Sequence, residues 1–320
     1  MKNSDIFVAV ISEPSFMSKS PIFGKPIGEY LADEIAAFPH AVFDCEKRVT
    51  RPKCKFFCLL YADMALVTED MIVGAAEALK RRNIPSLMLG AGYIVRENAE
   101  VDPKYAAAEK YFLRANDTSS VNMVYNEIRK RAKEKLEKGG VLCFGDAEAD
   151  FTATIEPGAI LCGNVKIKGN SHVCRGAKIT DSVIENSRIG ENSTVGPFAY
   201  VREGSEIGKN CRIGDFVEIK ASKLGDGVKA AHLAYVGNAE VGDNVNVGCG
   251  AVFCNYDGFK KHKTVVGKGA FIGANVNLVA PLKVGDGAYI AAGSTVTKDL
   301  PDGAFCIERT TQQVKQKRKT

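Results

Sequence analysis

Residues 189–224 read IGENSTVGPFAYVREGSEIGKNCRIGDFVEIKASKL, and an aliphatic side chain recurs in them at nearly every sixth position. The same spacing extends in both directions, from Ile155 to Val296, with occasional steps of five residues and a break before Val266. An α-helix repeats every 3.6 residues and a strand every two, so neither explains this period. A period of six is typical of a parallel β-helix, in which each hexad forms one face and three faces form a coil.

The sequence therefore predicts a left-handed parallel β-helix (hexapeptide repeat) whose aliphatic residues point into a prism-shaped core. About twenty hexads predict six to seven coils. The segment CNYDGFKKHKTV (254–265) interrupts the hexads, and we expect it to project from the prism as a loop. The aliphatic positions are Ile155, Leu161, Ile167, Val173, Ile179, Ile189, Val195, Val201, Ile207, Ile213, Ile219, Leu224, Ala230, Val236, Val241, Val247, Phe253, Val266, Ile272, Leu278, Val284, Ile290 and Val296.

The residues before the repeat predict a small α/β domain. Strand-like FVAVI (7–11) and FFCLLY (56–61) alternate with helix-like GEYLADEIAAF (28–38) and EDMIVGAAEALKRR (69–82). Such alternation is typical of a sheet covered by helices. A further helix is predicted over 118–138, with Gly139 and Gly140 as its stop.

A length of 320 residues also favours two units over one. We place the α/β domain at 1–117, a linker helix at 118–140, the β-helix at 141–309 and a basic tail at 310–320. The first residues carry too short an apolar stretch for a signal peptide, and no stretch is long enough for a membrane helix. The net charge of +5 is modest, and no aromatic platform accompanies the basic tail. We therefore expect a cytoplasmic protein without nucleic-acid or membrane partners.

The ten cysteines are scattered along the chain rather than set in a disulfide framework, so we expect reduced thiols. Cys54 and Cys58, with Cys45 nearby, lack the second pair or histidine that a zinc site requires. No metal site is therefore predicted, and these side chains are interpreted as small buried apolar groups.

Four runs of the repeat resemble a known family closely. The repeat is similar to the acetyltransferase domain of the bifunctional N-acetylglucosamine-1-phosphate uridyltransferase/glucosamine-1-phosphate acetyltransferase family over residues 190–309. The resemblance implies acetyl-CoA-dependent N-acetylation of glucosamine 1-phosphate, on the route to UDP-N-acetylglucosamine, by a homotrimer with active sites between subunits. The matching runs are GPFAYVREGSEIG (196–208), GDFVEIKASKLGDGVKAAHLAYVGNAEVGDNVNVGCG (214–250), CNYDGFKKHKT (254–264) and VAPLKVGDGAYIAAGSTVTKDLP (279–301).

The resemblance also implies a set of site residues. His232 suits a general base because the ordinary pKa of histidine lies near neutral pH. From its position two residues before Lys220, Glu218 is expected either to orient His232 or to favour its imidazolium form, and the alternative interpretation is a carboxylate on a solvated face. Cations suit a sugar phosphate, and a tyrosine and an asparagine suit sugar hydroxyls. The expected substrate-binding residues are Arg202, Lys220, Tyr235, Asn246 and Lys261, and the expected acetyl-CoA-binding residues are Cys249, Asn255, Tyr256, Ala274, Ala292 and Arg309. Cys249 and Ala274 depart from the family, which has Ala and often Ser there.

The N-terminal domain resembles a shortened nucleotidyltransferase domain of the same family, through GKPIGEYL (24–31), LYADMALV (60–67), GYIVREN (92–98) and the linker helix. The family's Gly-rich phosphate loop is replaced by SEPSFMSKSP (12–21), which contains no glycine. Backbone amides approach a triphosphate closely only where side chains are absent, so uridylyl transfer is expected to be lost. Asp63 stands where a Mg²⁺ ligand is expected, and Mg²⁺ would bind only if some of that function survives.

Three other functions are compatible with parts of this sequence pattern. One alternative keeps the acetyl transfer with another amino-sugar phosphate or a nucleotide amino sugar as acceptor, and another is a trimer that binds a nucleotide sugar without catalysis. The last alternative predicts erosion of the C-terminal site, whereas the departures concentrate in the N-terminal half. A β-helix carbonic anhydrase is excluded because its zinc needs three converging histidines, and the chain has only four, scattered from His40 to His262.

Overall fold

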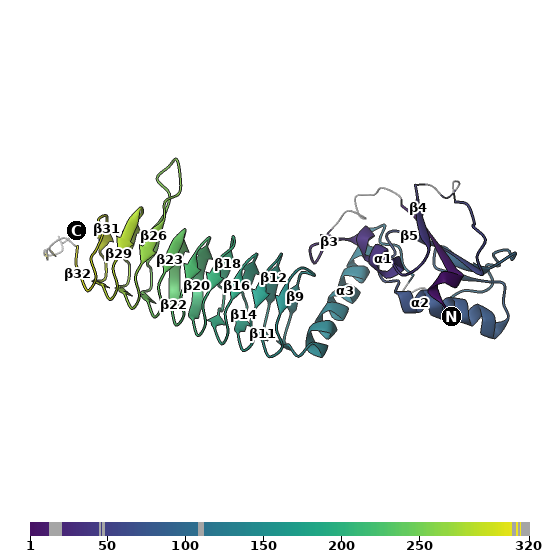
Figure 1. The fold of residues 1–320 in the computed structure, drawn as a ribbon, viewed down its shortest axis with the longest axis horizontal. Coiled ribbons are helices and arrows are strands. Elements are labelled where there is room, and N and C mark those ends of the chain that lie inside the picture. The colour runs from purple at the N-terminus through teal and green to yellow at the C-terminus, as the bar shows by residue number, and fades with distance from the viewer. Residues whose placement is uncertain are drawn as a thin grey trace, which may run out of the picture. The chain divides into compact units, whose positions relative to one another are not determined.

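The computed structural model describes residues 1–12, 21–44, 46, 49–107, 112–308, 312 and 314 (Figure 1). Arg309, most of the basic tail and all but the two ends of segment 12–21 lie outside the described residues. The chain divides into two compact units, Met1–Arg131 and Ala132–Thr320. The division falls inside helix α3 (Thr118–Lys138), whose bounds are those that the sequence predicts.

The first unit is built on a five-stranded sheet of order β4-β1-β5-β7-β6. Strand β1 runs parallel to β4 and β5, whereas β7 is antiparallel to β5 and β6. The predicted strands and helices are confirmed, although α1 ends at Ile35 because Pro39 disfavours helical backbone just before it. The elements are η1 (Asn3–Asp5), β1 (Ile6–Ile11), β2 (Pro21–Ile22), β3 (Lys25–Pro26), α1 (Ile27–Ile35), β4 (His40–Phe43), β5 (Phe56–Tyr61), α2 (Glu69–Arg82), β6 (Ser86–Leu89) and β7 (Gly92–Arg96).

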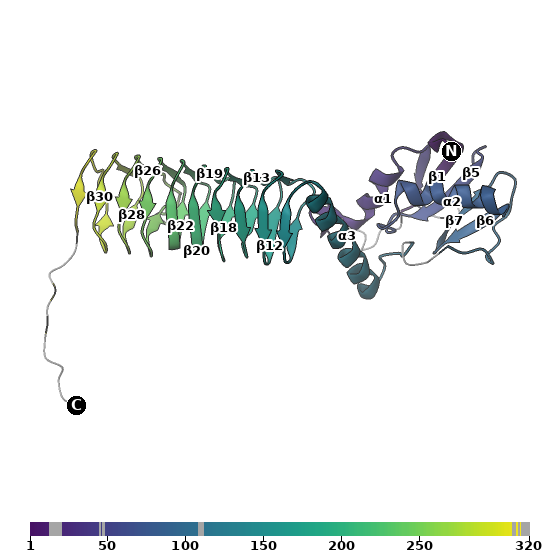
Figure 2. The ribbon, with the colours of Figure 1, turned by 90° about the horizontal axis from the view of Figure 1, so that it is seen from below.

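The second unit is the predicted left-handed parallel β-helix (Figure 2). Its first face is an eight-stranded parallel sheet, and each strand pairs with the strand one coil further along the chain. The strands of the first face are β10 (Thr154–Ile155), β13 (His172–Val173), β16 (Arg188–Ile189), β19 (Glu206–Ile207), β21 (Lys223–Leu224), β23 (Ala239–Val241), β26 (Thr264–Val266) and β29 (Leu282–Val284).

The other two faces belong to one continuous sheet, because the long strands β20 (Arg212–Lys220) and β22 (Lys229–Gly237) pass round the corner between them. The second face also holds β8 (Leu142–Phe144), β11 (Ile160–Cys162), β14 (Lys178–Thr180), β17 (Thr194–Val195), β24 (Asn246–Val247), β27 (Phe271–Ile272), β30 (Tyr289–Ile290) and β32 (Phe305–Cys306). The third face also holds β9 (Ala147–Ala149), β12 (Val165–Lys168), β15 (Val183–Glu185), β18 (Tyr200–Arg202), β25 (Val252–Cys254), β28 (Asn277–Val279) and β31 (Thr295–Val296).

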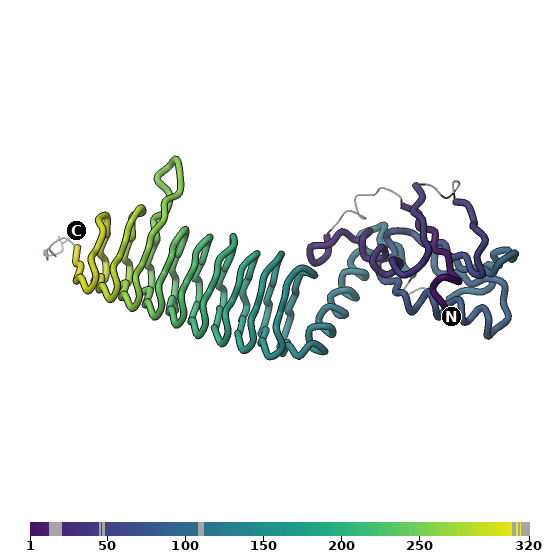
Figure 3. Tube along the Cα trace, viewed as in Figure 1, coloured from purple at the N-terminus to yellow at the C-terminus, as the bar shows by residue number. Residues whose placement is uncertain are grey.

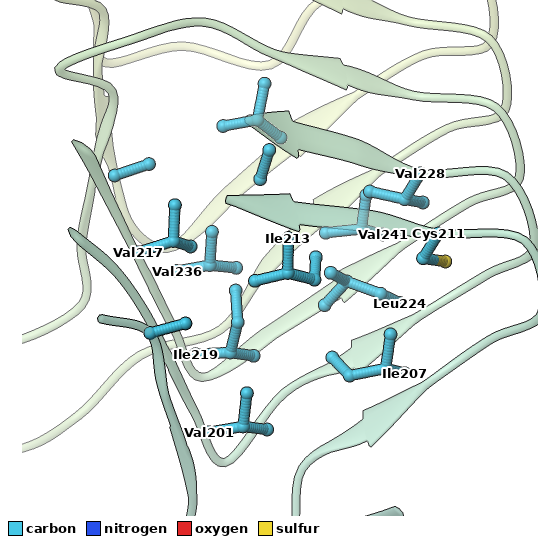
Figure 4. Close-up of a cluster of buried hydrophobic side chains, with 14 of the residues drawn as sticks. Val201, Ile207, Cys211, Ile213, Val217, Ile219, Leu224, Val228, Val236 and Val241 are labelled. Atoms are coloured by element: carbon cyan, nitrogen blue, oxygen red, sulfur yellow. The ribbon is translucent and has the colours of Figure 1, made fainter. Parts of the chain in front are cut away.

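The aliphatic column forms the core of the β-helix, as the sequence predicts. Every predicted position from Leu161 to Val296 is buried, and Ile155 packs partly buried against the same core. Figure 4 shows residues such as Val201, Ile207 and Ile213 pointing inward from neighbouring strands. Burying these side chains stabilises the fold by roughly 1.5–3 kcal/mol each for the larger ones.

The predicted number of coils is too low. The first face alone holds eight strands, against the six to seven coils expected. One missed position is Ile184, which lies five residues from both Ile179 and Ile189 and so escapes a search at every sixth residue. The other missed strands, β8 and β9, contribute Cys143 and Ala149 to the core in place of branched aliphatic residues.

The predicted loop is confirmed. Residues 255–263 leave the prism between β25 and β26 and project from it, as the tube in Figure 3 shows. Tyr256 and Lys261 form an isolated antiparallel bridge within this projecting loop. Phe259 at its tip is 94% exposed.

Candidate functional site

His232 lies at the corner between the second and third faces, next to Asp215 on the preceding coil. The register of β20 and β22 places the two residues opposite each other. His232 Nδ1 lies 2.7 Å from Asp215 Oδ1. A carboxylate accepts the Nδ1 proton, so the lone pair of the neutral ring resides on Nε2. Because the His232 side chain is 57% exposed, Nε2 is available to a ligand.

Asp215 remains a carboxylate near neutral pH. The hydrogen bond from His232 is the main cause that holds the pKa of Asp215 below its usual value, and its own backbone N–H adds to the effect. An ionised Asp215 fixes the ring orientation of His232 and stabilises the imidazolium that forms when Nε2 takes a proton.

The sequence assigned the orienting role to Glu218, and the structure gives His232 a different partner. In the register of β20 and β22, Glu218 lies opposite Tyr235, three positions from the His232 pair. Its Oε1 accepts instead from Arg202 Nε at 2.8 Å. Asp215 was therefore missed. It lies 17 residues before His232, the same offset that pairs Ile213 with Ala230, so the coil spacing carried the signal.

Two of the expected cations lie side by side on the third face. Arg202 and Lys220 are Cα partners on neighbouring coils. Glu203 Oε1 accepts from both, at 2.6 Å from Arg202 Nη1 and 3.2 Å from Lys220 Nζ. Burial opposes ionisation of Glu203, but hydrogen bonding by Lys220 and the charges of Lys220, Arg202 and Lys261 lower its pKa. Lys261 in the projecting loop also acts on this cluster, because it perturbs both Glu203 and Lys220.

Tyr235 lies on the third face beside Asn255, the first residue of the projecting loop. Asn255 is 7% exposed, and its Nδ2 donates to Asn238 Oδ1 at 2.6 Å and approaches the Tyr235 hydroxyl at 3.4 Å. Gly237 leaves room for this pair, because a Cβ there would lie 2.4 Å from Tyr235 Oη. The Tyr256 hydroxyl takes no part in this pair, because it donates to the carbonyl oxygen of Gly258 within the loop.

Asn246 does not join the other expected substrate ligands within one chain. It belongs to β24 on the second face, where its Cα partners are Lys229 and Phe271. Lys220 and Tyr235 lie on the third face. The corner that carries His232 separates the two groups.

Three of the expected acetyl-CoA ligands follow His232 along the same corner. The amide of Gly250 donates to Leu233 O at 2.6 Å, and those of Asn275 and Gly293 donate to Cys249 O and Ala274 O, each at 2.8 Å. These bonds stack one coil on the next. His232 is therefore followed on successive coils by exposed small side chains, which are Cys249, Ala274 and Ala292.

The first unit presents a different arrangement around Asp63, the residue expected as a Mg²⁺ ligand. Asp63 is 4% exposed. Arg114 Nε lies 3.0 Å from its Oδ1, and Arg114 Nη2 lies 3.0 Å from its Oδ2. The Arg114 guanidinium also lies 4.0 Å from the centre of the Tyr61 ring. An arginine thus occupies both oxygens that a metal ion would need.

Two other expectations concern the buried cysteines and membrane-spanning helices. Burial raises the pKa of the Cys58 thiol, in line with its interpretation as a small apolar group. None of the helices in the described part of the chain combines the length and the apolar character that crossing a lipid bilayer requires.

A model of the bacterial transferase hexapeptide (six repeats) family matches residues 186–221 and 263–298. The bifunctional protein GlmU of Brevibacillus brevis is 51% identical over 239 residues, which are 68% of this chain and 52% of that protein. GlmU of Clostridium botulinum (strain ATCC 19397 / Type A) is 47% identical over 205 residues, covering 58% of this chain and 45% of that protein.

Solved structures of hexapeptide proteins are also similar to parts of the chain. The UDP-N-acetylglucosamine acyltransferase from Campylobacter jejuni is 24% identical with a TM-score of 0.34, covering 48% of this chain and 68% of that one. LpxA from Acinetobacter baumannii is 20% identical with a TM-score of 0.37, covering 50% and 69%.

The chain spans about half the length of the curated relatives it matches. The similarity extends beyond the residues that the hexapeptide model covers, and it includes about half or more of this chain in both comparisons. The β-helix of this chain is thus similar to the bacterial transferase hexapeptide family and to part of the bifunctional GlmU proteins.

Proposed function

We propose that the β-helix transfers the acetyl group of acetyl-CoA to the amine of an amino-sugar 1-phosphate, with glucosamine 1-phosphate as the first acceptor to test. The observation that carries the proposal is the pair of His232 and Asp215, joined at 2.7 Å on an exposed corner. It supplies a general base whose Nε2 faces solvent, next to a row of small side chains.

The reaction needs a base because the attacking amine loses a proton. The amine nitrogen forms a bond to the thioester carbonyl carbon, the carbon–sulfur bond breaks, and coenzyme A leaves as the thiolate. The ammonium first loses one proton to solvent. His232 Nε2 then accepts one proton from the attacking amine and passes it to the thiolate, which becomes the coenzyme A thiol. Asp215 keeps the proton of the other ring nitrogen in place throughout.

The phosphate of the acceptor is assigned to the cluster of Arg202, Lys220 and Lys261. In the structure Glu203 and Glu218 compensate this positive charge. Arg202 and Lys220 are therefore already oriented, and an incoming phosphate would exchange one set of oxygen acceptors for another. Tyr235 and Asn255 lie on the same face and suit the sugar hydroxyls.

The acetyl-CoA chain is assigned to the corner that runs from His232 past Cys249, Ala274 and Ala292. Small side chains leave room there for an extended thioester arm. Tyr256 in the projecting loop and Arg309 are also proposed for acetyl-CoA, whereas Asn255, which the sequence grouped with them, contacts Tyr235 and is assigned to the sugar.

A homotrimer is part of the proposal. Asn246 lies on a different face from Tyr235 and Lys220, so one chain does not surround a small sugar with all three. A second chain packed against the corner of His232 would supply the second-face residues to the first chain's third-face residues. Closed symmetric association is the usual way such a site is completed.

Uridylyl transfer is proposed to be lost. The supporting observation is the buried ion pair of Asp63 and Arg114, in which both carboxylate oxygens have a cationic partner. A Mg²⁺ ion would have to displace Arg114 from a site that is already neutral.

The test is coenzyme A release from acetyl-CoA and glucosamine 1-phosphate, with pyrophosphate release from UTP followed in parallel. The His232→Ala variant is expected to lose about 10²–10⁴-fold in kcat. The matched control is His40→Ala, an exposed histidine of the first unit, which is expected to retain full activity.

Turnover with glucosamine 1-phosphate that depends on His232 supports the proposed acetyl transfer. Absence of pyrophosphate release from UTP supports the proposed loss of uridylyl transfer. Turnover only with another amino-sugar phosphate or a nucleotide amino sugar would keep the chemistry and replace the acceptor. Absence of turnover with every amino sugar would overturn the proposal in favour of a binding role.

A further inference from the structure

Three side chains with metal-binding atoms meet on the first coils of the β-helix, several coils before the candidate acetyl-transfer site. They are Glu156, His172 and Cys174, and their ligand atoms all lie within 4.8 Å of one another. We propose that this cluster binds a divalent transition-metal ion, with Zn²⁺ the cation that a carboxylate, an imidazole and a thiolate suit best.

The coil register brings these residues together. Strands β10 and β13 are neighbours, and Thr154 lies opposite His172. Glu156 follows β10 directly, and Cys174 follows β13 directly. The spacing Glu-x15-His-x-Cys matches no short metal motif, which is why the sequence predicted no metal site. The three residues become neighbours only because the chain completes one turn of the β-helix between Glu156 and His172.

The ligand atoms are close to the geometry that zinc requires. His172 Nε2 lies 2.8 Å from Glu156 Oε1 and 4.0 Å from Cys174 Sγ. Around a tetrahedral zinc ion the corresponding separations are roughly 3.3–3.6 Å, so shifts of about half an ångström are enough. The other carboxylate oxygen, Glu156 Oε2, accepts from the Arg175 amide at 2.9 Å and holds the carboxylate in place.

Charge and access also fit. A carboxylate and a thiolate together neutralise a dication, and the imidazole binds as a neutral ligand. The side chains of Glu156 and His172 are 33% and 34% exposed, so an ion can reach them from solvent, whereas Cys174 is 1% exposed and would bind the ion from the inner side. Binding replaces the Cys174 S–H bond by a metal–sulfur bond and releases one proton to solvent.

Arg188 is the competitor for this site. Its Nη1 lies 2.6 Å from His172 Nδ1, so it donates to Nδ1, and the ring proton then lies on Nε2. A metal on Nε2 needs that proton on Nδ1, and therefore needs Arg188, which is exposed, to turn away. Replacing Arg188 by Gln removes a positive charge and offers an amide oxygen that accepts from Nδ1.

The experiment titrates the full-length protein with Co²⁺ under reducing conditions and follows the near-ultraviolet absorption that a cobalt–thiolate bond produces. We expect one thiolate-bound Co²⁺ per chain, displaced by Zn²⁺. The Cys174→Ser variant should lose the absorption, whereas the matched control Cys162→Ser, a half-buried cysteine on the second face, should keep it. Arg188→Gln should bind at least about tenfold more tightly than the wild type.

If Cys174→Ser does not fold, Glu156→Gln and His172→Gln still test the site, because both side chains are partly exposed and their replacement should leave the fold intact. Each should weaken Co²⁺ binding by about 10- to 100-fold while circular dichroism stays unchanged. Zn²⁺ should raise the melting temperature of the wild type more than that of Glu156→Gln at the same Zn²⁺ concentration. Absence of the thiolate absorption in the wild type, or equal binding by the wild type and these variants, would overturn the proposal.

Discussion

Two carboxylates, one in each unit, show how differently an aspartate is used in the two parts of this molecule. Asp63 in the first unit is 4% exposed and accepts from Arg114 through both oxygens. The Asp215 side chain in the β-helix is 38% exposed and binds the ring of His232, which is itself 57% exposed, through one oxygen.

A bond to a basic side chain therefore does not by itself identify a functional carboxylate, because both aspartates have one. A buried pair with every oxygen satisfied is closed to ligands, and its removal leaves a charge without a partner. An exposed pair contributes little to stability but holds a reactive ring nitrogen toward solvent. The structure therefore predicts that substitutions at Asp63 affect folding and that substitutions at Asp215 affect chemistry.

The largest effect is expected from Asp63→Ala. Arg114 would be left 21% exposed without its carboxylate, so the first unit should lose about 3 kcal/mol of unfolding free energy, while acetyl transfer by the β-helix stays intact. Urea denaturation followed by circular dichroism measures the loss. The double variant with Arg114→Ala should lose less than the sum of the two single variants, and additive losses would contradict a coupled pair.

Asp215→Asn should show the opposite profile. We expect kcat to fall by about 10- to 100-fold with KM nearly unchanged, because the variant no longer fixes the His232 ring. The urea midpoint should not move. Steady-state kinetics of coenzyme A release gives both constants, and Glu206→Gln, which removes an exposed partner of Lys223, is the matched control. A large loss of stability with normal kcat would remove the distinction between the two aspartates.

Gly237→Ala should act on the sugar side of the candidate site. The added Cβ would lie 2.4 Å from Tyr235 Oη and 2.8 Å from Asn255 Nδ2, so both side-chain ends must move. We expect kcat/KM for the amino sugar to fall roughly tenfold. Gly74→Ala in α2 meets nothing within 4 Å and should instead stabilise the first unit by about 0.5–1 kcal/mol. Unchanged kinetics in Gly237→Ala would remove Tyr235 and Asn255 from the site.

The smallest effect concerns the projecting loop at acid pH. The pKa of Asp257 is lowered from 3.8 to about 2, first by the amide of Lys260 and then by His262 and the amide of Phe259. Because the folded value is depressed, the contribution of Asp257 to loop order is present above about pH 4 and is lost as pH falls through 2. The Lys260 amide resonance should report this titration. Asp257→Asn should abolish it, and persistence of the titration in that variant would assign it to another group.

The β-helix was predictable because its signal is repeated on every coil. A period of six gave the three faces, the buried column and the projecting loop, and the same coil offset pairs Asp215 with His232. The pair of Asp63 and Arg114 carried no such signal, since its members lie 51 positions apart in a unit without a sequence repeat. Asn246 was assigned through the family resemblance, which says nothing of faces, and only the register shows that it lies on another face.

The coil-by-coil pairing of the β-helix has a consequence for how the molecule opens. Each strand bonds only to the coils before and after it, so spontaneous opening starts at the ends of the stack and frays inward. Strands β20 and β22, which hold Asp215 and His232, have paired coils on both sides. Their amide protons should exchange with solvent more slowly than those of β8 or β32, and the corner that carries His232 should stay assembled while the terminal coils open and close.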